Sequence, residues 1–224
     1  MKKILGKPKE TNNKLISLIQ RTKINDFYLK NRKDFRDRIL SSIDPQDDVL
    51  DIGKAMRDRH KKIVSKSLET LDVNDFGSYP DIVCDICSDL TPLENKYDKI
   101  ICIAILEHVY DPFRAVSNLK MMLKNGGKVF GYVPYLYHYH APQDLKFQDY
   151  FRFSKDALAY LFKDFNDVEL YPVRGRISSS FNIMFAGRWK KYIEKTNLNI
   201  FLDKLSSSEK NLKQCSGFNF IVKK

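Results

Sequence analysis

Short apolar runs alternate with helical stretches through the middle of this chain, and this alternation constrains the fold more than any other feature. The apolar runs are Val49–Ile52, Ser67–Val73, Ile82–Asp85, Lys99–Ala104 and Lys128–Val133. The run Lys99–Ala104 is almost wholly apolar, as expected for a strand of a parallel sheet that is covered on both faces. Alternation of strand and helix favours βαβ units with right-handed crossovers. We therefore predict a doubly wound, mostly parallel α/β sheet.

Two later segments complete the predicted sheet. Val168–Val173 and Phe218–Val222 are expected to be strands, which brings the sheet to seven strands. Asp111–Leu123 is predicted to be a helix because its apolar residues recur at three- and four-residue steps. We expect Asn125-Gly126-Gly127 to end this helix, since glycine tolerates the left-handed conformation that closes one.

The first part of the chain predicts a helical extension. Apolar residues at helical spacing indicate helix from about Asn12 to Ile43, with Asn25-Asp26 as a candidate break into two helices. Asp44-Pro45 ends the run because a residue before proline is pushed out of the helical region. We expect a helical extension over residues 1–45 and one α/β domain over residues 46–224. A basic, partly helical insert is expected at about residues 181–205.

The net charge of +11 is concentrated at the two ends of the chain. Residues 1–43 hold 12 Lys and Arg against 4 Asp and Glu, and residues 171–224 hold 11 against 3. A basic surface attracts anionic partners such as nucleotide-sugars, phosphorylated metabolites, lipids or nucleic acid. Solvated basic helices are an equally good explanation.

The sequence gives little indication of a membrane-spanning segment, a secretory signal or a metal site. No segment approaches the roughly 20 apolar residues that cross a bilayer, and Met1-Lys2-Lys3 is not followed by the apolar run of a secretory signal. We therefore expect a cytoplasmic protein without a membrane span. Cys84 and Cys87 have the spacing of a zinc half-site, but no second half-site accompanies them. No metal site is expected.

Acidic residues end the first three predicted strands. These are Asp51, Asp72 and Asp85. Because the carboxyl ends of parallel strands meet at one edge of a sheet, we expect the three to line one crevice. Asp72 lies 21 positions after Asp51, a spacing typical of the acid that accepts from ribose hydroxyls. Asp85 could accept from an adenine amino group. The alternative for each acid is a helix cap or a solvated loop.

Several ordered motifs extend this pattern. They are Val49–Gly53, Leu106-Glu107-His108-Val109, Asp111-Pro112 and Leu123–Gly127. Over residues 46 to 165 the chain resembles class I S-adenosylmethionine-dependent methyltransferases. The nearest likeness is to methyltransferase-like proteins of bacterial surface-polysaccharide gene clusters. Their later motifs correspond to Val133-Pro134-Tyr135, His140-Ala141-Pro142 and Asp149–Ser154 here.

The resemblance implies S-adenosylmethionine as the cofactor. The implied contacts are Asp51, Gly53, Arg57, Asp72, Val73, Asp85, Ile86 and Glu107. Asp51 and Gly53 would shape the methionine end, Asp72 would bind ribose, and Asp85 with Ile86 would flank adenine. The family's first loop commonly reads Asp-x-Gly-x-Gly-x-Gly, whereas two of those glycines are missing from residues 51–57. Close backbone approach to the ligand depends on such glycines.

The acceptor side is predicted to involve histidines and aromatic residues. Methyl transfer needs in-line placement and, for a hydroxyl acceptor, removal of a proton. His108 and His140 are the candidate bases, since imidazole titrates near neutral pH. A lid over about residues 134–154 is expected to bind the acceptor through Tyr135, His138, Tyr150 and Arg152. The alternatives are half-buried core histidines and an Arg152–Asp149 pair.

Three functions follow from these features. The leading hypothesis is methyl transfer to a small or carbohydrate-linked acceptor, including an anionic one, in surface polysaccharide biosynthesis. The second is a methyltransferase-like scaffold protein without activity, because the glycine loop is thinned. The third, a nucleic-acid methyltransferase, is disfavoured because Ala104–Glu107 replaces the Asn/Asp-Pro-Pro-aromatic motif and no RNA-binding module is recognised.

Overall fold

The computed structural model describes residues 23–24, 32–54, 56–141, 146–184, 201, 203–205 and 208–224. The strands are β1 (Lys23–Ile24), β2 (Asp48–Ile52), β3 (Ser67–Asp72), β4 (Ile82–Val83), β5 (Tyr97–Ile103), β6 (Leu123–Pro134), β7 (Asp167–Val173) and β8 (Gly217–Lys223). The α-helices are α2 (Arg32–Ser41), α3 (Pro112–Met122), α4 (Lys155–Leu161), α5 (Arg176–Met184) and α8 (Ser208–Lys213). Short 3-10 helices are η1 (Arg57–Lys62), η2 (Thr91–Leu93) and η3 (Leu106–His108).

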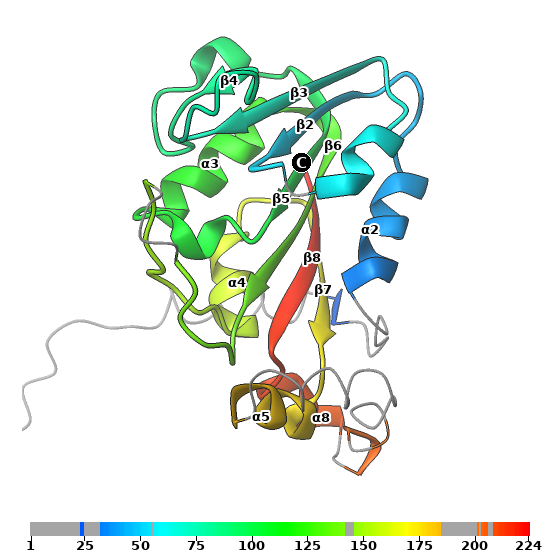
Figure 1. The fold of residues 1–224 in the computed structure, drawn as a ribbon. Coiled ribbons are helices and arrows are strands. Elements are labelled where there is room, and N and C mark those ends of the chain that lie inside the picture. Colours follow the sequence, from blue (N-terminus) through cyan, green and yellow to red (C-terminus); the bar gives the residue numbers. More distant parts are fainter. Residues whose placement is uncertain are drawn as a thin grey trace, which may run out of the picture.

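The strands form one sheet in the order β1-β7-β8-β6-β5-β2-β3-β4 (Figure 1). β2 runs parallel to β3 and β5, and β6 runs parallel to β5. β8 is antiparallel to both of its neighbours, β6 and β7. The predicted doubly wound, mostly parallel seven-stranded sheet is therefore confirmed over β2 to β8.

One edge of the sheet differs from the prediction. β1 adds a two-residue strand that pairs in parallel with Glu169 and Leu170 of β7. The predicted helix from Asn12 to Ile43 is therefore wrong at Lys23–Ile24, although α2 confirms its last part. The exposed edge of β7 offers unpaired backbone groups, and pairing with them outweighs the weak local preference for helix. The rest of the predicted helical extension before Arg32 lies outside the described residues.

Two apolar layers enclose the sheet (Figure 1). On one face Phe35 and Ile39 of α2 pack with Val49 of β2 and Ile101 of β5. On the other face, the larger cluster joins α3 and α4 to alternate residues of the same strands, such as Leu50 of β2. Successive side chains of a strand point to opposite faces, so each central strand contributes to both layers.

The glycines after α3 serve a different purpose from the predicted one. The helix ends at Met122 and β6 begins at once, so the prediction that Gly126 closes the helix is wrong. Gly126 has a φ of +79°. It lies where the register between β5 and β6 shifts, from Tyr97 opposite Leu123 to Lys99 opposite Lys128. Its left-handed conformation therefore fits a bulge in β6.

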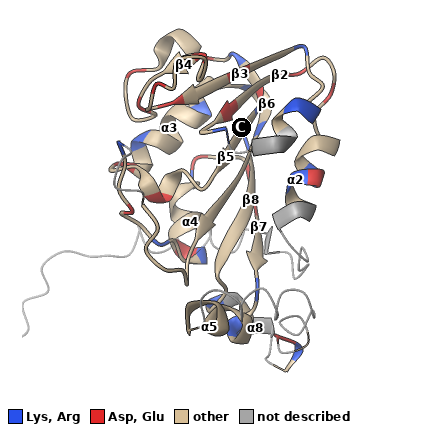
Figure 2. Ribbon diagram, in the orientation of Figure 1, with Lys and Arg blue, Asp and Glu red and all other residues tan. Residues whose placement is uncertain are grey.

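The C-terminal helices pack together at the far ends of β7 and β8 (Figure 1). The carboxylate of Asp203 accepts from the backbone N–H of Gly175 at 2.7 Å and the hydroxyl of Ser178 at 2.6 Å. Lys and Arg lie on α2 and at this α5–α8 end (Figure 2). Residues 185–200 of the predicted basic insert lie outside the described residues. Among the helices that the structure describes, none is long and apolar enough to cross a membrane.

Candidate active site

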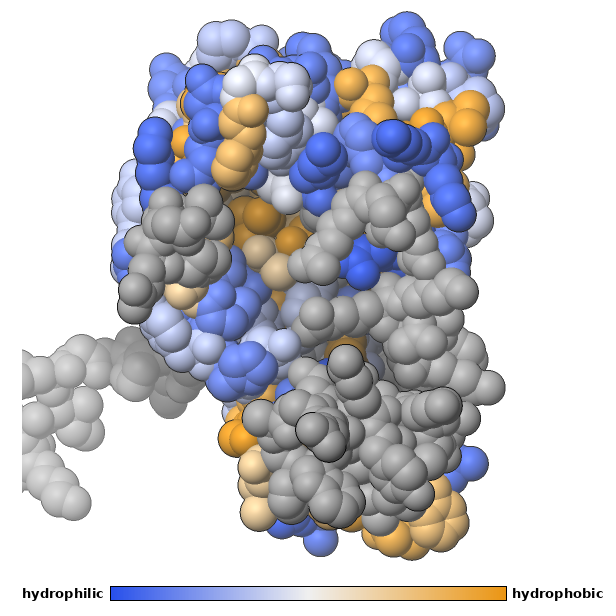
Figure 3. Space-filling view, in the orientation of Figure 1, coloured by the Kyte–Doolittle hydropathy of each residue, from blue (hydrophilic) through white to orange (hydrophobic). Residues whose placement is uncertain are grey.

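A cavity of about 430 Å³ opens where β2, β3, β4 and β5 end. Cavities of this size hold small-molecule ligands. Residues 53–54 after β2, 72–74 around the end of β3, 84–86 after β4 and 103–105 around the end of β5 form its wall. The space-filling view shows apolar residues inside a hollow on this face (Figure 3). The cavity thus occupies the crevice at the carboxyl ends of the strands, where open α/β sheets bind their ligands.

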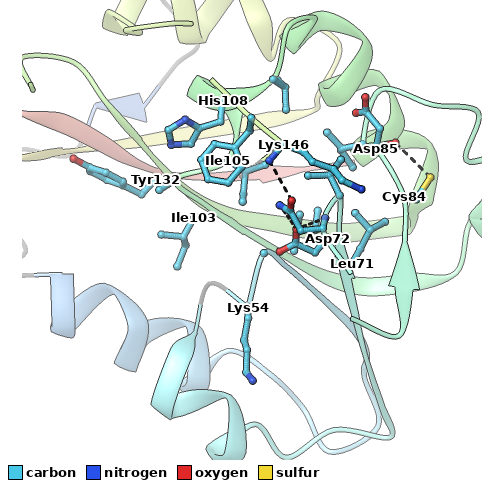
Figure 4. A pocket seen from close by; sticks show the side chains of 18 of the residues that line it. Lys54, Leu71, Asp72, Cys84, Asp85, Ile103, Ile105, His108, Tyr132 and Lys146 are labelled. Atoms are coloured by element: carbon cyan, nitrogen blue, oxygen red, sulfur yellow. Dashed lines mark hydrogen bonds between the residues drawn. The ribbon is translucent and has the colours of Figure 1, made fainter. Parts of the chain in front are cut away.

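Asp72 and Val73, two of the predicted cofactor contacts, line this cavity, and Asp72 is labelled in Figure 4. The Asp72 carboxylate accepts from the backbone N–H of Asn74 at 2.9 Å and from the hydroxyl of Tyr79 at 3.3 Å. Burial and the charge of Asp72 raise the pKa of Tyr79, so this phenol stays a donor. The neighbours of Asp72 thus fix its carboxylate at the cavity wall, with lone pairs left for a ligand.

Asp85 and Ile86 lie on the adjacent loop and also line the cavity. Asp85 accepts from the backbone N–H of Cys87 at 2.8 Å. The buried amide of Asn118 in α3 donates to the carbonyls of Ile86 at 2.7 Å and Ser88 at 2.8 Å. Helix α3 therefore holds this loop in place through two buried hydrogen bonds.

The first loop keeps part of the expected backbone shape. Gly53 has a φ of +67° and its N–H donates to the carbonyl of Leu71 at 2.8 Å. A Cβ at Gly53 would lie 2.6 Å from Cδ1 of Ile105 and would strain the left-handed backbone, so glycine is favoured here. Lys54 also takes a left-handed φ of +47° and lines the cavity. The side chain of Arg57 lies outside what the structure describes, so its predicted contact stays a prediction.

Asp51 is placed differently from the prediction. Its side chain is buried and is not part of the cavity wall. One carboxylate oxygen lies 2.9 Å from Nδ1 of His60. Successive side chains of a strand point to opposite faces. The Asp51 side chain therefore points away from the face of its neighbour Ile52, which lines the cavity. His60 was not predicted as a partner, because its neighbours are charged residues that indicate a solvated turn.

Glu107, His108 and His140 form a cluster at another wall of the cavity. Only His108 is a lining residue, and it is seen beside Ile105 and Tyr132 in Figure 4. Glu107 is wholly buried, with one carboxylate oxygen 3.8 Å from Nε2 of His108 and 3.7 Å from Nε2 of His140. The proximity of Glu107 raises the pKa of His140 despite its partial burial. The two predicted bases thus lie together, although only one faces the cavity.

The predicted lid is tied to this cluster. The carbonyl of Glu107 accepts from the N–H groups of Tyr150 at 2.8 Å and Phe151 at 3.1 Å. Arg152 donates to both carboxylate oxygens of Asp149, at 2.5 and 2.6 Å. Burial opposes the ionisation of Asp149, but its hydrogen bonds from Arg152 and from the His140 backbone lower its pKa to about 2.

The predicted acceptor residues fall into two groups. Tyr150 lines the cavity and is 52% exposed. Tyr135 packs against Phe218, and His138 stacks on Tyr137. Neither of these two predicted residues is among those that line the cavity. Arg152 also donates to backbone carbonyls of the lid, in addition to its pair with Asp149, and its predicted contact with substrate stays a prediction.

Several lining residues were not predicted from the sequence. They are Phe35, Arg36, Asn74, Phe76, Tyr79, Tyr110, Tyr132, Lys146, Phe147 and Asn219. Phe35 and Arg36 belong to α2, which the sequence assigned to a separate extension. Aromatic residues in loops carry no periodic signal, so only the fold reveals that they converge.

Comparisons with known proteins agree with this geometry. Residues 41–131 match the family model described as a methyltransferase domain. The chain is 24% identical over 92 residues to the ubiquinone biosynthesis O-methyltransferase of Coxiella burnetii, a match covering 41% of this chain and 32% of that protein. The chain thus spans about a third of the length of the curated relatives it matches.

Solved structures show the same fold at low identity. A methyltransferase from Archaeoglobus fulgidus, described as dependent on S-adenosylmethionine, is 15% identical with a TM-score of 0.53, covering 87% of this chain and 95% of its own. Phosphoethanolamine N-methyltransferase 2 of Haemonchus contortus, solved with S-adenosyl-L-methionine, is 15% identical with a TM-score of 0.52, covering 89% and 54%. The [4+2]-cyclase SpnF is 14% identical with a TM-score of 0.53, covering 96% and 94%.

The strand order and the strand-end crevice define a class I methyltransferase fold. Together with the match of residues 41–131 to a methyltransferase domain model, they agree with the predicted resemblance to S-adenosylmethionine-dependent methyltransferases. The residues present suit that cofactor. The cavity combines carboxylates at two strand ends with the apolar side chains of Leu71, Ile86 and Ile105, which fits a nucleoside.

Proposed function

We propose that this chain transfers a methyl group from S-adenosylmethionine to a hydroxyl oxygen of a small, ring-shaped or carbohydrate-linked acceptor. One observation carries the proposal. His108, which belongs to a cluster with buried Glu107 and with His140, lines the same cavity as Asp72 and Asp85. A hydroxyl acceptor must lose a proton to react, whereas an uncharged amine is already nucleophilic. A group of proton acceptors beside the cofactor crevice therefore favours oxygen as the methylated atom.

Each part of the cavity has a role in this proposal. Asp72 accepts from the ribose hydroxyls, Ile86 and Asp85 flank the adenine, and the Gly53 backbone approaches the methionine end. When bound, the cofactor supplies a methyl group on an activated sulfonium. The protein's own contribution is to orient the acceptor and to promote loss of its proton.

The cavity wall also suggests the class of acceptor. Tyr110, Phe147 and Tyr150 provide flat apolar surfaces at the wall, which pack against a ring. Lys54 and Lys146 lie among the lining residues, and Arg36 joins them from α2. This favours an acceptor that carries an acidic or phosphate group, such as a nucleotide-sugar.

The biological setting is part of the same proposal. The Pro134, His140-Ala141-Pro142 and Asp149–Ser154 motifs support a role in surface polysaccharide biosynthesis, in the cytoplasm. The name of the Coxiella burnetii relative, an O-methyltransferase, supports methylation of oxygen. The acceptor of that relative is not carried over to this chain.

A scaffold function without catalysis is the second candidate. Lys54 adopts a left-handed φ, a conformation that costs a non-glycine residue roughly 1–2 kcal/mol, and no glycine follows it in the loop. Without those glycines the backbone approaches a cofactor less closely, which favours loss of cofactor contacts. Binding of S-adenosylhomocysteine separates the two candidates.

The test is transfer of a labelled methyl group from S-adenosylmethionine by the full chain. The acceptor panel contains nucleotide-sugars, phenols and catechols, primary amines and RNA. We expect label on one of the hydroxyl classes and on none of the amines. Label on amines alone would refute methyl transfer to oxygen, label on RNA alone would refute a small or carbohydrate-linked acceptor, and absence of cofactor binding would favour the scaffold.

A further inference from the structure

Three groups that donate lone pairs converge beside the cavity, and one of them, His108, lines it. One ligand atom each from Glu107, His108 and His140 lies within 4.8 Å of the other two. Glu107 and His108 belong to η3, whereas His140 comes from the predicted lid. The fold therefore brings together two segments whose sequence spacing gives no metal-binding signal.

His108 is held with one ring nitrogen turned to the cluster. Its Nδ1 lies 2.8 Å from the carbonyl oxygen of Gln148. A carbonyl only accepts, so Nδ1 carries the proton and Nε2 of the neutral ring has a lone pair. That Nε2 is the atom 3.8 Å from the carboxylate of Glu107.

His140 is oriented in the same way. Its Nδ1 lies 3.2 Å from the carbonyl oxygen of His138 and 3.2 Å from a carboxylate oxygen of Asp149. Arg152 in turn fixes Asp149 through both carboxylate oxygens. A histidine whose outer nitrogen binds a carboxylate or carbonyl is the usual arrangement of a metal ligand, because the contact sets the tautomer and the ring orientation.

Glu107 supplies the charge. Its side chain is fully buried, and within the described part of the chain neither carboxylate oxygen has a hydrogen-bond partner. The distances of 3.7 and 3.8 Å to the two imidazoles exceed those of an N–H···O hydrogen bond. A buried carboxylate that faces two further lone pairs is unfavourable unless a cation lies among them.

We propose that Glu107, His108 and His140 bind a divalent transition-metal ion of the zinc type. Ligand atoms about 2.1 Å from a tetrahedral ion lie about 3.4 Å apart. The two distances from Glu107 to the imidazoles, 3.7 and 3.8 Å, are close to this value, and all three ligand atoms lie within 4.8 Å of one another, so rotation of the side chains closes the site. Two imidazoles and one carboxylate leave the fourth coordination position open. The proposal replaces the expectation of no metal, which rested on cysteine and histidine spacing alone.

The ion has a role that rests on the proposed methyl transfer to oxygen. His108 lines the cavity, so the open position faces the acceptor. A hydroxyl bound to the ion loses its proton to solvent at lower pH. The resulting oxygen then forms a bond to the methyl carbon while the methyl–sulfur bond breaks, which leaves S-adenosylhomocysteine.

The experiment is titration of the full chain, first stripped with chelator, with Co²⁺ and with Zn²⁺. Calorimetry measures stoichiometry, and the visible bands of Co²⁺ report nitrogen and oxygen ligands. We expect one equivalent to bind and, at about a hundredfold excess over Kd, to raise the melting temperature by about 5–10 °C. Glu107→Gln and His140→Ala are expected to lose both effects, whereas His138→Ala, at the neighbouring exposed histidine, keeps them.

The variants also control for folding. Glu107→Gln removes an unpaired buried charge, so the metal-free variant is expected to melt no lower than the metal-free wild type. Failure of the wild type to bind either ion, or equal binding by Glu107→Gln, overturns the metal site. S-adenosylhomocysteine binding is measured in the same samples. If it persists while the ions do not bind, the metal inference fails and the methyltransferase proposal stands.

Discussion

At the scale of single residues, Lys124 joins two strands by contacting one carboxylate on each. Its ammonium lies 2.7 Å from Asp48 of β2 and 2.7 Å from Asp98 of β5. The hydrogen bond from Lys124 is the main cause of the lowered pKa of Asp48. Burial opposes the ionisation of Asp98, but the hydrogen bonds from Lys124 and from the Asp48 backbone, with the charge of Lys124, together lower its pKa. This network lies at the end of the sheet opposite the cavity, so it stabilises the fold without contacting the site.

Replacing Lys124 by methionine tests this network through pH. A carboxylate with a lowered folded pKa adds stability above its ordinary pKa of 3.8, and that stability is lost as the pH falls through the folded value. Lys124 is 36% exposed, so we expect a loss of only about 1 kcal/mol at pH 7. Urea unfolding should show this gap in full at pH 7 and a smaller one at pH 3, which shrinks further as the pH falls through the folded pKa of Asp48. An equal gap at both pH values would contradict the electrostatic explanation.

Single residues also show what the sequence could reveal about the site. Asp72 and Asp85 were predicted because the order of strands makes their ends adjacent, and both line the cavity. Asp51 had the same signal but pairs with His60. The pattern reports where a strand ends, whereas the direction of each side chain depends on partners from distant segments.

At the scale of elements, Arg152 connects the two halves of the lid. Its guanidinium bridges Asp149 to the carbonyls of Tyr137 and His138. Lysine cannot reproduce this planar fork, so Arg152→Lys is expected to free part of the lid while leaving the sheet intact. We expect backbone amides of residues 134–141 and 146–154 to exchange about tenfold faster, which corresponds to about 1.4 kcal/mol.

The control for the lid variant is Arg114→Lys, at an exposed arginine of α3. It is expected to leave amide exchange in the lid unchanged. Binding of S-adenosylhomocysteine should stay within twofold of the wild type in both variants. Unchanged exchange in Arg152→Lys would show that Arg152 does not hold the lid.

Elements were predicted from the sequence with uneven success. β2 to β8 and α3 were anticipated because apolar runs and helical periodicity are strong in them. β1 was missed because a two-residue edge strand depends on its neighbour β7 and not on its own composition. The extra length of β6 was missed because its first residues follow α3 directly, without a turn signal.

At the scale of the whole molecule, the last residues of the chain complete the centre of the sheet. β8 lies between β6 and β7 and pairs along its whole length with both. Phe218, Phe220 and Val222 are fully buried in the larger apolar cluster. The chain therefore cannot close its sheet until the C-terminal segment is in place.

Deletion of residues 217–224 is expected to abolish cooperative folding. The variant loses hydrogen bonds on both sides of a central strand, and each buried phenylalanine contributes about 3–5 kcal/mol. These losses exceed the usual stability of a domain, about 5–15 kcal/mol. Urea unfolding followed by circular dichroism should show no cooperative transition. A sharp transition like that of the full chain would show that β8 is dispensable.

The central claim is that carboxylates at neighbouring strand ends hold one nucleoside-shaped cofactor. Titration calorimetry with S-adenosylhomocysteine tests it on the wild type, on Asp72→Asn and on Asp75→Asn, whose exposed carboxylate lies outside the cavity wall. We predict one site in the wild type, affinity at least about tenfold lower in Asp72→Asn through loss of charge-assisted hydrogen bonds, and wild-type affinity in Asp75→Asn. No heat and no thermal stabilisation of the wild type would contradict the claim.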